Sequence, residues 1–126
     1  MAYHEGDFAL KKQNPYTNDD LDETKEGVSS SGAMIVWLHV MNESSSKRWL
    51  KIFDAAGGDV TMGTTEADYN FVIATLGDTN GAGFVLDEPI VLQNGLTIAA
   101  TTARALDDDS APGADEVSVN MAYKEA

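Results

Sequence analysis

Cysteine is absent from this sequence of 126 residues. Without cysteine there are no disulfides, no thiolate metal ligands and no cysteine nucleophile, which fits assembly in a reducing cytoplasm. Stability must therefore come from packing or from oligomerisation. The length corresponds to one domain, which is large enough to bury about two thirds of its unfolded surface.

Basic residues are scarce. Eight lysines and arginines stand against 21 aspartates and glutamates, so the formal net charge is −13. A surface of this charge repels phosphate backbones and anionic lipid. We therefore expect neither a nucleic acid nor a membrane surface among the partners.

Long apolar runs are also absent. The longest run, residues 33–38, is far too short to span a bilayer. The first residues, MAYHEGDFALKK, lack the apolar stretch of a signal peptide. These features predict a soluble protein.

The first 32 residues differ in composition from the rest, being polar and without helical or strand periodicity. Such a segment cannot offset its own ordering entropy unless a neighbour supplies apolar surface. We therefore expect an extended polar arm over residues 1–32 and a separate domain over residues 33–126. The arm is either a mobile tail without a role or a strap across a partner, with Tyr3, Phe8 and Tyr16 as its anchors.

From residue 33 onward, short apolar runs alternate with clusters of Gly, Asn, Asp and Ser, as is typical of β proteins. Strands are predicted over residues 33–41, 48–55, 70–76, 83–86, 89–93, 96–102 and 117–124. This pattern predicts an all-β fold of two packed antiparallel sheets, a β-sandwich of jelly-roll or Greek-key kind.

The faces of several strands follow from alternation. The first strand is apolar on both faces and is expected to be covered on both sides, with Met34, Val36, Leu38 and Val40 on one face and Ile35, Trp37, His39 and Met41 on the other. The run over residues 70–76 is also expected to be buried. The last two strands are expected to point Leu96, Ile98, Ala100, Val117, Val119, Met121 and Tyr123 inward.

Two glycine-containing stretches are interpreted as turns. Residues 77–84 lack the helix and the lysine of a phosphate loop. Asn94 and Gly95 suit a two-residue hairpin turn or a bulge.

The stretch over residues 103–116 contains consecutive aspartates and a Pro-Gly pair. Asp107 and Asp109 are weak candidates for a metal site, because they share one side of an extended chain while Asp108 points away. A calcium site needs six to eight oxygens around one point. Contiguous acids favour a solvated loop instead, so no metal or other cofactor is expected.

No catalytic constellation is recognisable. His4 and His39 lie far apart in sequence without a suitably spaced acid, and there is no Gly-x-Ser-x-Gly elbow. We therefore expect no enzymatic activity. Trp37 and Trp49 lie inside apolar runs and are interpreted as core or interface residues, with a sugar-binding face as the alternative.

Three segments, "RWLKIFDAA", "LQNGLTIAATT" and "DDDSAPGADEVSVNMAYK", together with the polar Gly-rich segments between them, resemble a recurrent pattern in small structural proteins of tailed bacteriophages. In that pattern a Leu-Lys-Ile/Leu-Tyr/Phe-Asn/Asp strand comes first and a Gly-Leu-x-Ile-Ala-x-Thr-Thr strand follows late. An Asp-rich loop and a closing Val-x-Val-Asn-x-x-Tyr strand complete it. The resemblance covers residues 48–124. Residues 57–68 depart from it, since the proline-containing approach to a strand is missing.

The resemblance implies a jelly-roll-like virion protein that decorates the phage head, also called a cement protein. Its partner would be the major capsid protein on the outer surface of the head, and it would be a homotrimer at three-fold positions, made in the host cytoplasm. The acidic surface suits the outside of a capsid better than its DNA-filled interior. The alternative is a tail-fibre or baseplate module that binds host polysaccharide through Trp37, Trp49 and the Asp-rich loop.

Overall fold

The computed structural model describes residues 2–75 and 83–126. Its elements are, in chain order, the 3₁₀ helix η1 (Glu5–Phe8), β1 (Gln13–Asn18), β2 (Glu26–Ser29), β3 (Ala33–Asn42), β4 (Arg48–Phe53), the 3₁₀ helix η2 (Gly57–Asp59), β5 (Tyr69–Ile73), β6 (Gly83–Leu86), β7 (Ile90–Leu92), β8 (Leu96–Thr101) and β9 (Val117–Glu125). No helix in these two ranges is long and apolar enough to cross a membrane.

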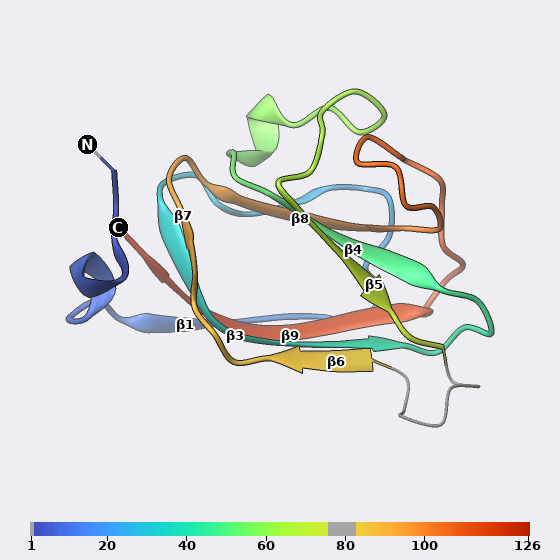
Figure 1. The fold of residues 1–126 in the computed structure, drawn as a ribbon, viewed down its shortest axis with the longest axis horizontal. Coiled ribbons are helices and arrows are strands. Elements are labelled where there is room, and N and C mark those ends of the chain that lie inside the picture. Colours follow the sequence, from blue (N-terminus) through green and yellow to red (C-terminus); the bar gives the residue numbers. More distant parts are fainter. Residues whose placement is uncertain (1, 76–82) are drawn as a thin grey trace.

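The strands form two antiparallel sheets that pack against each other (Figure 1). The front sheet has the order β1-β9-β3-β6, with β7 paired to another part of β3, and the back sheet has the order β2-β8-β4-β5. The predicted all-β sandwich is therefore confirmed.

With β7 set aside, the strands pair like a long ribbon folded back on itself. β1 pairs with β9 and β3 with β6 in the front sheet, while β2 pairs with β8 and β4 with β5 in the back sheet. Both halves of the chain therefore contribute strands to both sheets.

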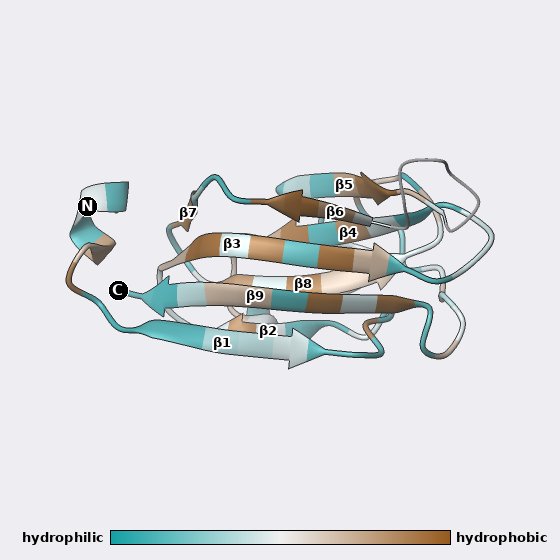
Figure 2. Cartoon of the chain, turned by 90° about the horizontal axis from the view of Figure 1, so that it is seen from below, coloured by the Kyte–Doolittle hydropathy of each residue, from teal (hydrophilic) through white to brown (hydrophobic). Residues whose placement is uncertain are grey.

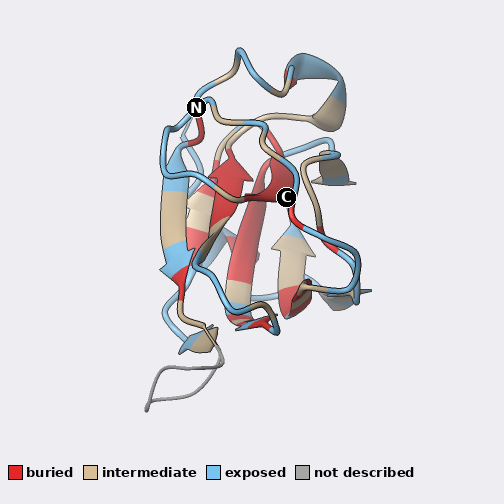
Figure 3. Ribbon diagram, turned by 90° about the vertical axis from the view of Figure 1, so that its right-hand side faces the viewer, coloured by how far each residue is buried: buried red, intermediate tan, exposed pale blue. Residues whose placement is uncertain are grey.

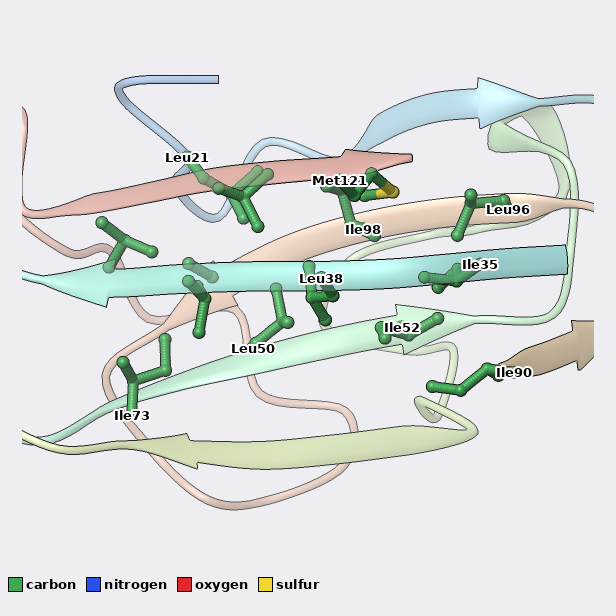
Figure 4. Packing of buried hydrophobic residues seen from close by; sticks show 14 of the residues in the cluster. Leu21, Ile35, Leu38, Leu50, Ile52, Ile73, Ile90, Leu96, Ile98 and Met121 are labelled. Atoms are coloured by element: carbon green, nitrogen blue, oxygen red, sulfur yellow. The ribbon is translucent and has the colours of Figure 1, made fainter. Parts of the chain in front are cut away.

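The main core lies between the sheets (Figures 3 and 4). The predicted alternation of the last two strands is confirmed, because Leu96, Ile98, Ala100, Val117, Val119 and Met121 all belong to this core. Residues at every second position of a strand point to the same face. Each fully buried Leu, Ile or Val contributes about 1.5–3 kcal/mol relative to an exposed one.

A β-bulge changes the faces of β3. Adjacent residues of β9 pair with Ile35 and Trp37, so Val36 is an extra residue in β3. A bulge reverses the alternation beyond it. Before the bulge, Ile35 therefore faces the core. After the bulge, Leu38 and Val40 face it. The expectation that both faces of this strand are covered is wrong beyond the bulge, where the outward residues Trp37 and Met41 are exposed. Before the bulge it holds, because both Met34 and Ile35 are buried.

β5 is an edge strand, contrary to the expectation that this run is buried. Among the strands of the described residues it pairs with β4 alone, and Val72 is 45% exposed. Phe71 stacks on Tyr69 and contacts Phe84 of β6, with ring centroids 5.5 Å apart in the latter pair. These rings fill the side of the sandwich where β5 and β6 meet. The predicted turn over residues 77–84 lies mostly outside the described residues.

The first 32 residues are not a separate arm. β1 pairs along its whole length with β9, and β2 pairs with β8. Leu21, between them in the chain, is fully buried in the main core (Figure 4), and its backbone amide donates to the carbonyl of Val117 in β9 (2.9 Å). The neighbouring strands supply the apolar surface that the segment lacks, which is the condition under which such a segment becomes ordered. The boundary predicted after residue 32 is therefore not a domain boundary.

Candidate interaction surfaces

The outer face of the front sheet is broad and largely solvent-exposed, and β6, β3, β9 and β1 lie side by side across it in Figure 2. Residues paired directly across antiparallel strands share a face. The register therefore gives the outward side chains, which we call the open face: Gln13, Pro15, Thr17, Trp37, His39, Met41, Gly83, Val85, Ser118, Asn120, Ala122 and Lys124.

The open face carries no aspartate or glutamate at these positions, although the chain has 21 acidic residues. Its one charged residue is Lys124, whose Nζ donates a hydrogen bond to the backbone carbonyl of Phe8 (3.2 Å). Three large apolar side chains on the adjacent strands β3 and β6 are exposed there. Trp37 is 39% exposed, Met41 37% and Val85 66%.

This combination is typical of the centre of a protein interface. Interface centres are depleted of charged residues and enriched in aromatic residues and methionine. Exposed apolar residues that gather on one surface mark a place where a partner binds. Trp37, predicted as an interface residue, lies on this surface, so that prediction stands as a hypothesis with a defined location.

The three aromatic residues expected to anchor an arm contact the protein itself. The ring of Tyr3 lies 5.9 Å from that of Phe8, and Phe8 is fully buried. Tyr16 of β1 is half-buried against the main core, and burial raises the pKa of its phenol. Phe8 and Tyr16 therefore hold the N-terminal segment onto the sandwich and are not available as anchors for a partner.

A pocket of about 610 Å³ opens on the opposite side of the molecule, on the outer face of the back sheet. It is lined by Trp49, Asn70, Arg104, Ala105 and Leu106. Trp49 belongs to β4 and Asn70 to β5, whereas the other three follow β8 in the chain. The two tryptophans that sequence reasoning grouped together thus lie on opposite faces of the sandwich.

Lys51, beside this pocket, is the fully buried charged residue that sequence reasoning missed. Its Nζ donates hydrogen bonds to Oδ1 of Asn70 (2.9 Å) and to the backbone carbonyl of Ala103 (3.2 Å). Burial lowers the pKa of Lys51, and the negative charges of Asp108 and Asp107 partly oppose this effect. The sequence contained a signal for this burial. Lys51 lies two residues from Trp49 and two from Phe53 in an apolar strand, so its side chain lies on the same face as theirs.

The Asp-rich loop is held by hydrogen bonds within the protein. Both the backbone amide and the hydroxyl of Ser110 donate to Oδ2 of Asp108. Desolvation by itself would raise the pKa of Asp108, but the hydrogen bonds from Ser110 and from the amide of Ala103, together with the charge of Lys51, lower it below its ordinary value. Asp108 thus interacts with the buried lysine and does not point away from the protein.

The two weak metal candidates do not belong to a recognisable metal site. Asp107 is exposed, and the carboxylate of Asp109 lies over Gly63. Within residues 2–75 and 83–126, no group of three or more His, Cys, Asp or Glu side chains is placed to hold an ion.

The chain was compared with protein-family models, with curated proteins and with solved structures, and none of them matches.

Proposed function

We propose that the protein is a non-enzymatic virion protein of a tailed phage, which binds the outer surface of the head and stabilises the shell. The resemblance over residues 48–124 supports this function. The single observation that carries it is the open face, which exposes Trp37, Met41 and Val85 and carries no aspartate or glutamate in a protein with a net charge of −13.

The charge distribution favours one way of docking. Carboxylates brought against a partner lose hydration and need compensating cations. The open face avoids this cost, and its burial removes Trp37, Met41 and Val85 from water at about 25 cal/mol per Å² of apolar area. A paired sheet is already ordered, so little conformational entropy is lost on binding. The major capsid protein is the proposed partner, and the acidic loops then face solution outside the head.

We infer further that the sandwich is a jelly roll. The pairs β1 with β9, β2 with β8, β3 with β6 and β4 with β5 are those that arise when an antiparallel ribbon is rolled into two sheets. β7 is then an addition along β3. Viral capsid proteins and lectins recurrently use this architecture. We also propose a homotrimer at three-fold positions of the shell, with the three open faces directed at the shell.

Co-sedimentation with expanded phage capsids tests this function. Val85→Asp places a carboxylate on the open face, and Val72→Asp is its matched control at an exposed valine on an edge strand of the back sheet. We expect Val85→Asp to weaken shell binding at least about tenfold, which corresponds to about 1.4 kcal/mol. Val72→Asp should bind like the unmodified protein.

Two results would contradict the proposal. One is that the unmodified protein binds no expanded capsid. The other is that Val85→Asp and Val72→Asp bind equally well while both have melting temperatures close to that of the unmodified protein.

The second candidate function is a tail-fibre or baseplate module that binds host polysaccharide. The specific observation in its favour is that Trp49 lines a pocket. If this candidate is correct, glycan binding is lost in Trp49→Ala, and Val85→Asp has no effect on attachment.

A further inference from the structure

The pocket beside Trp49 stays accessible when the open face is covered. Trp49 pairs with Val72 of β5 and with Thr101 of β8. Leu50 and Ile52, which lie on the other face of β4, point into the main core. Trp49 therefore faces outward from the back sheet, whereas the open face looks outward from the front sheet. A ligand in the pocket and a shell on the open face do not compete for space.

Hydrogen bonds fix the walls of the pocket. The buried amine of Lys51 connects Asn70 of β5 to the backbone of Ala103. Nδ2 of Asn70 donates to the backbone carbonyl of Arg104 (2.6 Å), which holds the loop against the sheet. A site whose residues are held in place by neighbouring hydrogen bonds loses less entropy on binding.

The groups that remain available in the pocket are an aromatic ring, an aliphatic side chain and a guanidinium. Trp49 is half-buried, and Leu106 is 43% exposed. Arg104 is exposed and forms no ion pair with the described residues, among which Arg48 and Glu116 make the one salt bridge. The guanidinium of Arg104 therefore presents free donors beside the indole.

These groups match the chemistry of a pyranose ring. The C–H face of the ring is apolar and packs against an indole, while its hydroxyls at the rim accept hydrogen bonds from a guanidinium. A negatively charged sugar is disfavoured, because Asp107 and Asp109 are exposed on the same loop and the net charge is −13. We propose that this pocket binds a neutral pyranose unit of a polysaccharide.

The inference goes beyond head decoration and does not depend on it. It gives the protein two independent sites on opposite faces, so a shell-bound copy presents its sugar site to the surroundings of the particle. Because the pocket is open at the surface, we expect a dissociation constant on the order of 1 mM for a single site.

The test titrates the full-length protein with maltohexaose, cellohexaose, mannohexaose and chitohexaose, with hexagalacturonate as the anionic comparison. In a Trp37→Phe background, Trp49 is the sole indole, so its fluorescence reports binding directly. At least one neutral hexasaccharide should shift this fluorescence saturably, and hexagalacturonate should not.

Saturation-transfer NMR on variants then locates the site. Trp49→Ala should abolish binding, and Arg104→Ala, an exposed position where folding is not at risk, should weaken it about tenfold. Val85→Asp should leave sugar binding unchanged while it reduces shell binding, which separates the two sites. The inference fails if none of the neutral hexasaccharides binds, if hexagalacturonate binds better than all of them, or if Arg104→Ala binds as tightly as the unmodified protein.

Discussion

The two outer faces of the sandwich are built differently. The back sheet is covered in part by the chain itself, since Val60 and Ala67 pack on Phe53 and Ala99 in a small second core, and the loop after β8 accepts a hydrogen bond from buried Lys51. Among residues 2–75 and 83–126 there is no such cover over Trp37, Met41 and Val85 of the front sheet, all of which are exposed, as is the whole outward side of β1.

The difference shows how the chain distributes its polar residues. Where loops cover a sheet, even a lysine is buried, because an amide and a carbonyl accept its hydrogen bonds. Where no loop covers the sheet, the chain omits carboxylates and keeps apolar residues, which a partner can cover without having to pair buried charges. The outer face of the back sheet is thus covered in part by the chain itself, whereas Trp37, Met41 and Val85 on the outer face of the front sheet are exposed.

The largest expected effect comes from deletion of residues 1–27. This deletion removes β1 from the front sheet, half of β2 from the back sheet, and Leu21 from the core between them. We expect a chain that no longer folds cooperatively, as measured by thermal melting of its circular dichroism.

Deletion of residues 1–11 is the control, because it spares both strands and Leu21. It should cost less stability, chiefly the burial of Phe8. If the chain without residues 1–27 melts at the temperature of the undeleted protein, the N-terminal segment is a mobile tail. The assignment of β1 and β2 to the two sheets is then wrong.

The next effect concerns two neighbours on β9 that point to opposite sides. Val119 is fully buried in the main core, and Asn120 lies on the open face. Val119→Asp buries an unpaired charge and should destabilise by about 3–5 kcal/mol. Asn120→Asp should change the free energy of unfolding by less than about 0.5 kcal/mol but should weaken shell binding. Urea titration and capsid co-sedimentation measure the two quantities, and equal losses of stability would contradict the assigned register.

The sequence predicts regular strands well and irregular ones poorly. β8 and β9 alternate without interruption, so the inward residues around Ile98 and Val119 follow from periodicity alone. In β3 the extra residue Val36 reverses the pattern, and nothing in the local sequence marks the bulge. β1 and β2 carry no apolar periodicity of their own, because they are edge strands whose order depends on β9 and β8.

The two candidate surfaces were predictable only in part. Trp37 and Trp49 stand out in the sequence as possible interface residues. Their separation onto opposite faces, however, follows from the bulge in β3 and from the assignment of β3 and β4 to different sheets. The open face also depends on the register among four strands that are distant in sequence, such as the pairing of Thr17 with Asn120. Such long-range register is not contained in local patterns.

A smaller effect is expected at the covered face. Lys51→Ala removes a buried side chain and leaves Oδ1 of Asn70 without its donor, whereas the carbonyl of Ala103 keeps the hydrogen bond from the hydroxyl of Thr101. We therefore expect a loss of about 2–3 kcal/mol. Lys51→Met restores most of the volume and should recover part of this loss. His39→Ala on the open face is the control and should cost less than about 0.5 kcal/mol. A loss at His39 as large as that at Lys51 would show that the front sheet is also covered.

The smallest effect is a dependence on pH at Asp108. Its pKa in the folded protein is below the ordinary value of 3.8, so the unfolded chain takes up the proton first as the pH falls. The stabilisation from the ionised carboxylate is therefore fully present above pH 3.8 and is lost as the pH falls through the lower folded pKa. In Asp108→Asn the uncharged amide cannot titrate. The unmodified protein should thus be the more stable of the two at neutral pH, and the difference in their free energies of unfolding should vanish in acid.

Urea titrations of both proteins across this pH range measure this difference in free energy of unfolding. Taking the difference cancels the titration of the other carboxylates. A gap that stays constant down to the lowest pH at which both proteins fold would mean that Asp108 contributes through its shape and its hydrogen bonds to Ser110, and that its charge does not help to hold the loop over buried Lys51.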